Sequence, residues 1–404
     1  MNSSPDLRRL IGRGAICAGA FAVGLYGIAP LFSGTGSLGS AAIGQPMHSS
    51  LPAPPADGVM GFVVSRFIPP IVPGKEACPG GPSPKLRDAY LASLVPAERE
   101  RLTRKENEKE LERNWKLVGL GPNDTNFCSQ PDLFDRPLLK TVQSKLAIGL
   151  DLDGSKRGEG CAHEEFSSPS GDQGIDNQHY RVMGCKLEWR GLDGNQSDQS
   201  VGTRQFHASG EWTQVILLRG VDSLQDDDEV EVIYGNTPDR PFIDSKGNFL
   251  PGATFTISDK PPRHRNLLKG RIANGVLTTS PARIELTQTW GQGGARDIRG
   301  NRGVYDFHEG MLRLTFQPDG TLKGLVGGYQ PLFNAILSPA LGGAGAVVAA
   351  GIDCAAELKT LRKYADGMRD PRTGQCTGIS SAMQIEAVPA FVNDVEPRRM
   401  STAK

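Results

Sequence analysis

Six cysteines in the body of this chain constrain its fold more than any other feature. An even number of cysteines without any Cys-x-x-Cys spacing favours disulfides over a metal site. The six form three groups of near neighbours along the sequence, so we expect each to pair with its neighbour. The expected pairs are Cys78–Cys128, Cys161–Cys185 and Cys354–Cys376, while the seventh cysteine, Cys17, lies in the apolar N-terminal segment.

Disulfides need an oxidising compartment, and the N-terminus indicates how the chain reaches one. Arg8, Arg9 and Arg13 precede an uncharged apolar stretch from Gly14 to Phe32, and small residues follow it. A basic region followed by an apolar region is the pattern of an export signal. Residues 1–42 are therefore predicted to be an export signal, or an uncleaved signal anchor, because the apolar stretch is long enough to span a bilayer. We expect the protein in the periplasm, at the cell surface or secreted, with an inner-membrane anchor as the alternative.

Changes in composition divide the chain beyond this segment. Residues 43–75 are rich in proline and predict an extended linker. Good helix formers dominate residues 76–138, β-favouring runs between turn residues fill residues 139–335, and helical spacing returns in residues 336–392. The last residues, 393–404, are polar and predict a flexible tail.

The strand-rich part of the sequence indicates an antiparallel fold. It contains two hairpin signals, Asn274-Gly275 and Asp319-Gly320. No amphipathic helices alternate with its strands, so a parallel sheet is not expected. The sequence therefore predicts a mainly β fold: an antiparallel, jelly-roll-like β-sandwich with helical N- and C-terminal additions.

Oxygen-bearing side chains cluster in the stretch from residue 149 to residue 178. Asp151 and Asp153 lie two residues apart at the end of an expected strand, so both can point the same way. Asp172, Asp176 and Asn177 follow in a glycine-flanked loop that one predicted disulfide would hold nearby. Calcium takes about six to eight oxygen ligands, so we predict these five residues as a calcium site. The alternative is ordinary turn chemistry, in which Asp and Asn bond to their own backbone.

A second acidic group and a set of carboxylates suggest weaker candidates. Asp226, Asp227 and Asp228 precede an expected strand and are typical of a solvated turn. A glycoside hydrolase needs two facing carboxylates and often aromatic platforms for its sugar. The residues that offer these groups are Glu164, Glu165, Glu188, Trp189 and Trp212. We find no Gly-x-Ser-x-Gly elbow and no phosphate-binding loop, so the catalytic residues stay unknown.

The charge balance excludes one class of partner. Lys and Arg together number 45, as do Asp and Glu, whereas a nucleic-acid-binding protein normally has a net basic surface. We therefore predict no nucleic-acid partner, and contact with a membrane only through the N-terminal segment. The expected function is binding or scaffolding, with a glycan or an envelope protein as partner. The alternative is an extracytoplasmic hydrolase that acts on a polysaccharide or an ester, so whether the protein is an enzyme stays open.

Overall fold

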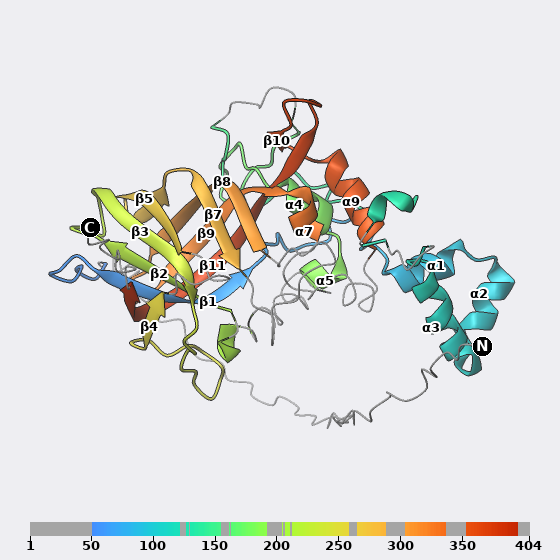
Figure 1. Ribbon diagram of the computed structural model, residues 1–404, viewed down its shortest axis with the longest axis horizontal. Helices are drawn as coiled ribbons and strands as arrows, with labels where there is room; N and C mark the ends of the chain where they lie inside the picture. The colour runs from blue at the N-terminus through green and yellow to red at the C-terminus, as the bar shows by residue number, and fades with distance from the viewer. Residues whose placement is uncertain are drawn as a thin grey trace, which may run out of the picture. The chain divides into compact units, whose positions relative to one another are not determined.

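The computed structural model shows a β-rich body with short helices beside it (Figure 1). It describes residues 51–121, 127–128, 130–154, 161, 163–191, 204, 207–210, 212–257, 265–287, 304–336 and 353–394. Among these residues the strands are β1 (Met60–Ile68), β2 (Thr213–Arg219), β3 (Asp227–Thr237), β4 (Thr254–Ile257), β5 (Arg265–Ala273), β6 (Val276–Thr279), β7 (Ala282–Thr287), β8 (Val304–Phe316), β9 (Leu322–Pro331), β10 (Gly367–Arg369) and β11 (Cys376–Asp394).

The first and last strands close the sheet into a barrel. Along the sheet the strands follow the order β1-β2-β3-β5-β6-β8-β9-β11. β1 also pairs antiparallel with β11, so that Gly61 lies opposite Ala390 and Ile68 opposite Gln384. Eight antiparallel strands therefore form a closed ring, to which β4, β7 and β10 add further pairings. The predicted open β-sandwich is wrong, although the mainly β, antiparallel character is correct.

The sandwich prediction failed because both closing strands lie in segments that seemed to have other roles. β1 falls inside the predicted linker, residues 43–75, where flanking prolines mask a nine-residue strand. β11 runs through the predicted helical segment, residues 336–392, and into the first two residues of the predicted tail. β1 also lacks an alternating pattern because both of its faces are buried: Phe62 faces the barrel interior, while Val63 packs beneath an outer layer.

Apolar side chains form one core inside the barrel and another outside it. The interior holds side chains from every strand of the ring, such as Phe62, Ile216 and Leu314, which are at most 1% exposed. Outside, β4 and the segment before it lay Phe255 and Phe249 over the outer face of β1, β2 and β3. β4 then pairs in parallel with the end of β11, so this part of the barrel wall is buried on both sides.

The structure confirms both predicted hairpin turns. Asn274 and Gly275 join β5 to β6 with positive φ angles of 51° and 76°, which Asn and Gly tolerate better than other residues. Asp319 and Gly320 join β8 to β9, and the Asp319 carboxylate accepts the backbone N–H of Thr321 at 3.0 Å.

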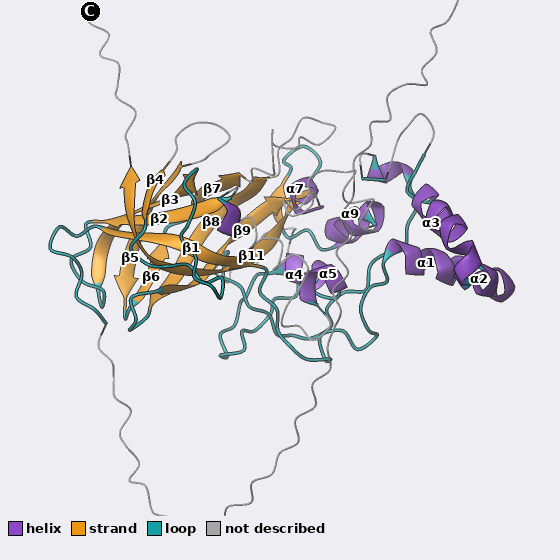
Figure 2. Cartoon of the chain, turned by 90° about the horizontal axis from the view of Figure 1, so that it is seen from below, coloured by secondary structure: helices purple, strands orange, loops and turns teal. Residues whose placement is uncertain are grey.

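Most of the helices gather beside one end of the barrel, which we call the helical end (Figure 2). This is the end at which β1 finishes and β2 begins. α4 packs on β11, and α7 directly follows β9. In the described part of the chain the helices are α1 (Leu86–Ser93), α2 (Pro96–Thr103), α3 (Glu108–Leu117), α4 (Gln178–Met183), α5 (Leu187–Arg190), α7 (Leu332–Ile336) and α9 (Cys354–Lys363), with the short 3-10 helices η1 (Lys105–Asn107) and η2 (Pro131–Leu133).

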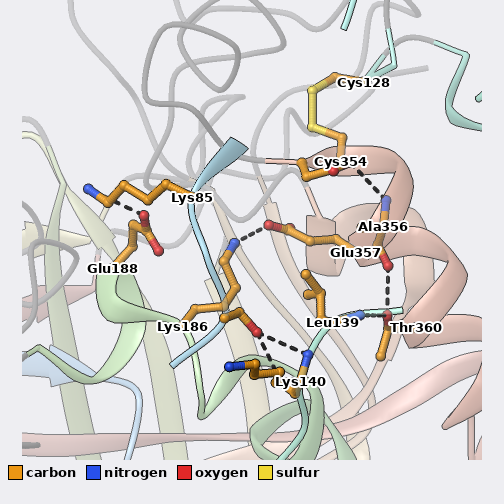
Figure 3. Close-up of polar contacts among 12 residues, drawn as sticks. Lys85, Cys128, Leu139, Lys140, Lys186, Glu188, Cys354, Ala356, Glu357 and Thr360 are labelled. Atoms are coloured by element: carbon orange, nitrogen blue, oxygen red, sulfur yellow. Dashed lines mark hydrogen bonds and ion pairs between the residues drawn. A yellow bond between two sulfur atoms is a disulfide. The ribbon is translucent and has the colours of Figure 1, made fainter. Parts of the chain in front are cut away.

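A second apolar cluster and several polar contacts tie these helices together. Leu102 and Trp115 belong to the same buried cluster as Leu361 of α9. Figure 3 shows the polar contacts around α9: the Thr360 hydroxyl accepts the backbone N–H of Leu139, and Lys186 forms an ion pair with Glu357. Segments that are distant in sequence therefore meet at α9.

All six predicted cysteines form disulfides, but every predicted pair is wrong. The observed bridges are Cys78–Cys185, Cys128–Cys354 and Cys161–Cys376, with sequence separations of 107, 226 and 215 residues. Neighbours in sequence do not pair, because the fold brings residues 75–190 together with α9 and the start of β11. The three bridges indicate an oxidising, extracytoplasmic environment.

The predicted export segment, residues 1–42, lies outside the described residues. The same holds for residues 395–404 of the predicted tail. None of the described helices is both long and apolar enough to cross a bilayer.

Two fully buried histidines predict that acid destabilises the protein. Burial lowers the pKa of His207 to about 3, and burial together with the Lys186 charge does the same for His179. Between pH 6.5 and pH 3 the unfolded chain therefore binds protons that the folded chain excludes, so stability falls as the pH falls through this window.

A substitution of His207 measures its share of this effect. Between pH 7 and pH 5, His207 should account for about 2 kcal/mol of the lost free energy of unfolding. Urea unfolding at both pH values should show that the free energy of unfolding falls by about 2 kcal/mol less in His207→Phe than in the parent protein. Equal losses in the two proteins would contradict the prediction.

Candidate metal centre

Three of the five predicted calcium ligands lie together near the helical end of the barrel. Leu150 and Asp176 form an antiparallel bridge in which the Asp176 N–H donates to the Leu150 carbonyl at 2.8 Å. This bridge fixes the loop that follows Leu150 against the segment before α4. Asp151 and Asp153 lie on that loop, so the backbone itself places them beside Asp176.

The carboxylates of Asp151, Asp153 and Asp176 offer oxygens that all lie within 4.8 Å of one another. Asp176 is buried, with 7% of its surface exposed, whereas Asp153 is half-buried and Asp151 is exposed. Backbone donors hold two of them in place: Leu152 N–H donates to Asp176 at 2.7 Å, and Gly154 N–H donates to Asp151 at 2.8 Å. The cluster therefore has one buried oxygen donor and an open side.

Burial and neighbouring carboxylates make Asp176 an unusually weak acid. Burial is the main cause that raises its pKa to about 7, and Asp153, Asp366 and Asp151 raise it further, against the opposing Leu152 N–H. The charged side chains with the largest influence on Asp176 are thus all carboxylates. A cation at this place would remove both the mutual repulsion and part of the cost of burial.

Asp366 joins this group, although no pattern in the sequence indicates it. It lies between α9 and β10, and its carboxylate accepts the backbone N–H of Ser380 at 2.6 Å. Burial and the charge of Asp153 raise its pKa to about 6, with the Ser380 contact acting against them. The same carboxylates raise the pKa of Tyr329 on β9, after burial as the main cause. The segment is brought near by the hydrogen bond from the Gln178 N–H to the Ser380 hydroxyl at 2.8 Å and by the bridge between Cys161 and Cys376, neither of which the sequence predicts.

The other two predicted ligands, Asp172 and Asn177, lie outside this cluster. Asp172 accepts hydrogen bonds from the hydroxyls of Ser168 and Ser170 at 2.8 and 3.0 Å, within its own exposed turn. Asn177 caps α4, accepting the N–H of Tyr180 at 3.1 Å and donating to the Ile148 carbonyl at 2.8 Å. These contacts are of the kind that Asp and Asn make in turns and helix caps.

The donor set suits a hard cation. The three clustered side chains offer only carboxylate oxygens, and calcium prefers carboxylates, carbonyls and water in a flexible shell. The nearby histidines are engaged elsewhere: the His163 ring lies 3.1 Å from the Ala365 carbonyl, and that of His179 lies 3.0 Å from the Ser381 hydroxyl. A site built of oxygen alone disfavours zinc and copper, which prefer nitrogen or sulfur.

The second acidic group forms a turn. Asp226 accepts the N–H of Asn274 at 3.0 Å, and Asp227 accepts the N–H groups of Asp222 and Glu229 at 2.7 and 3.1 Å. These contacts order the connection into β3, as expected for a solvated turn.

The residues considered for glycoside hydrolysis make ion pairs or lie buried in the apolar clusters. Glu164 pairs with Lys145, and Glu188 pairs with Lys85. Both tryptophans are buried: Trp189 is 4% exposed against His179, and Trp212 is 2% exposed in the barrel core. Neither ring offers an open platform for a polysaccharide.

Comparison with protein-family models, with curated proteins and with solved structures finds no match to this chain.

Proposed function

We propose that this chain is an exported binding or scaffolding protein whose barrel is stabilised by a calcium ion at Asp151, Asp153 and Asp176. Its place of action is the periplasm, the cell surface or the medium, and an uncleaved N-terminal segment would hold it at the inner membrane. One observation carries the proposal: three carboxylates lie within 4.8 Å of one another, one of them buried among further carboxylates.

The position of these carboxylates explains what the ion would do. Asp151 and Asp153 lie on the loop after Leu150, Asp176 precedes α4, and Asp366 lies between α9 and β10. An ion bound by the first three joins two loops at the helical end and relieves the repulsion that reaches Asp366. Its role is therefore to hold the end of the barrel in one conformation, which suits a protein that presents a fixed surface to a partner.

Thermal and chemical unfolding with and without calcium tests the proposal. Calcium at about 100 times its dissociation constant should add roughly 3 kcal/mol to the free energy of unfolding, because the ion binds the folded chain alone. Asp176→Asn should abolish this gain. In chelator the same variant should be as stable as the parent protein or more stable, because it removes a buried carboxylate that nothing neutralises.

Asp172→Asn is the matched control. It removes a carboxylate from the same loop region but lies outside the cluster, so its gain from calcium should equal that of the parent protein. Identical unfolding midpoints for calcium-loaded and chelated parent protein would refute the calcium site.

A further inference from the structure

The bridge between Cys78 and Cys185 joins a half-buried cysteine to a fully buried one. Cys78 lies on a loop in which its neighbours Glu76 and Pro79 are exposed. Cys185 lies between α4 and α5 and is 0% exposed. A thiol that approaches from solvent therefore reaches this bridge at the sulfur of Cys78.

The guanidinium group of Arg190, the last residue of α5, lies against that sulfur. Its Nη1 donates to Cys78 Sγ at 2.8 Å. The same nitrogen donates to the Gly184 carbonyl at 2.8 Å, and Nη2 donates to the Gly74 carbonyl at 2.9 Å. The two carbonyl groups thus hold the guanidinium in place beside the disulfide.

Arg190 is buried, with 7% of its surface exposed, and its partners in the described part of the chain are these two carbonyls and the sulfur rather than a carboxylate. Lys186, four residues earlier, is also buried but forms an ion pair with Glu357. Tyr180 near Arg190 supplies no negative charge, because burial raises the pKa of its hydroxyl. Removing a charge from water is costly without a counter-charge. The sulfur of a disulfide is uncharged, whereas the thiolate that reduction leaves on Cys78 would be that counter-charge.

This arrangement favours the reduced form of the bridge. A positive charge beside a cysteine lowers the pKa of its thiol, and a disulfide whose reduced form is stabilised is more easily reduced. The second sulfur also has a partner after reduction, because Cys185 Sγ lies 3.7 Å from the Ala77 carbonyl, which can accept its S–H group. Both products of reduction therefore have partners in the folded protein.

We propose that Cys78–Cys185 is a redox-active disulfide that oxidises dithiols, with Arg190 stabilising the thiolate of Cys78. This activity goes beyond the binding or scaffolding role proposed above and does not depend on calcium.

The exchange proceeds in two steps. A thiolate of the dithiol attacks Cys78 Sγ, a bond forms between these two sulfurs, and the bond between Cys78 and Cys185 breaks. The electron pair of that bond stays on Cys185, which takes a proton. The second thiol of the dithiol, as its thiolate, then attacks the dithiol sulfur bound to Cys78 and releases Cys78 as a thiolate beside Arg190. The dithiol becomes a disulfide, the protein gains two electrons and one proton, and the other proton goes to solvent.

Equilibration of the oxidised full chain with graded ratios of reduced to oxidised dithiothreitol at pH 7 tests the proposal. Alkylation of the free thiols and peptide mapping then show which bridges are open at each ratio. Cys78 and Cys185 should become alkylated at a ratio at least about tenfold lower than the other four bridged cysteines require. Circular dichroism should show an intact β signal at that ratio, because the other two bridges remain closed. Simultaneous reduction of all three bridges, or earlier reduction of another bridge, would overturn the proposal.

Arg190→Met tests the role of the guanidinium, since it removes the charge and keeps an apolar side chain of similar length. The ratio that opens Cys78–Cys185 should rise at least about tenfold, because a hydrogen bond to a charged group is lost. Arg181→Met is the matched control: Arg181 is also buried, at 9% exposed, but donates to the Gln178 side chain and the Glu164 carbonyl.

The control variant should open Cys78–Cys185 at the same ratio as the parent protein. After selective reduction, the rate at which iodoacetamide alkylates Cys78 should rise at a higher pH in Arg190→Met than in the parent or the control, because the thiolate has lost its cation. Equal ratios and equal pH profiles in all three proteins, or equal shifts in both variants, would show that Arg190 does not stabilise the thiolate.

Discussion

Reduction of the three disulfides is expected to unfold this protein at neutral pH and room temperature. In the chain-entropy model, loops of 107, 215 and 226 residues each contribute roughly 5 kcal/mol to stability. Together these contributions match or exceed the total stability of about 5–15 kcal/mol typical of a folded protein. Far-ultraviolet circular dichroism in dithiothreitol should show loss of the β signal without any denaturant.

Removing one bridge should lower the free energy of unfolding by nearly the same amount whichever bridge is removed. Because the entropy of loop closure grows only with the logarithm of loop length, replacing Cys128 and Cys354 by serine should cost within about 1 kcal/mol of what replacing Cys78 and Cys185 costs. Alkylation of the unreduced protein under denaturing conditions is the control, and it should label none of these four cysteines. A reduced, alkylated chain that keeps its native spectrum would contradict the expected dependence on disulfides.

The cysteines also show what could be predicted from the sequence and what could not. Their even number and the export-like N-terminus indicate disulfides, but pairing depends on which segments meet in space. Cys354 begins α9, and its partner Cys128 lies 226 residues earlier, next to helices that pack on α9. No local pattern records that contact, so adjacency in sequence was a poor guide.

The barrel illustrates a similar limit. The two hairpin turns were predictable because Asn-Gly and Asp-Gly act locally. Closure was not predictable, because it depends on the pairing of Gly61 with Ala390, residues near opposite ends of the described chain. β1 reads as a linker since prolines surround it and both of its faces are buried, which removes the alternation that identifies a strand.

The candidate metal site was partly predictable, because some of its residues are close in sequence and others are not. Asp151 and Asp153 lie two residues apart on the loop after Leu150, and Asp176 reaches them through the short bridge to Leu150. Asn177 lies outside the cluster and caps α4, and an Asn before a helix is a typical N-cap. Asp366 was missed because only the β10–β11 region and its disulfide bring it close to Asp153.

The second large loss of stability is expected when one partner of a buried ion pair is replaced. Lys186, before α5, and Glu357, on α9, form an ion pair in which the side chains are 9% and 1% exposed (Figure 3). Burial raises the pKa of Glu357, and the Lys186 charge opposes that rise. The attraction between the two charges therefore offsets the cost of removing each from water, and neither charge is compensated when the other is absent.

Lys186→Met should destabilise the protein by about 3–5 kcal/mol at pH 8, because it leaves the Glu357 carboxylate buried without its cation. The carboxyl then has a folded-state pKa further above its unfolded value. The loss of stability should therefore shrink as the pH falls through that raised pKa and the group becomes neutral.

Replacing both residues, Lys186→Met with Glu357→Leu, should recover most of the stability, since two apolar side chains of similar size can fill the space of a buried pair. Urea unfolding of the parent, both single variants and the double variant gives the coupling energy directly. Additive losses in the two single variants would show that the charges are not coupled, and α9 would then be held by its apolar contacts, its other polar contacts and the disulfide at Cys354.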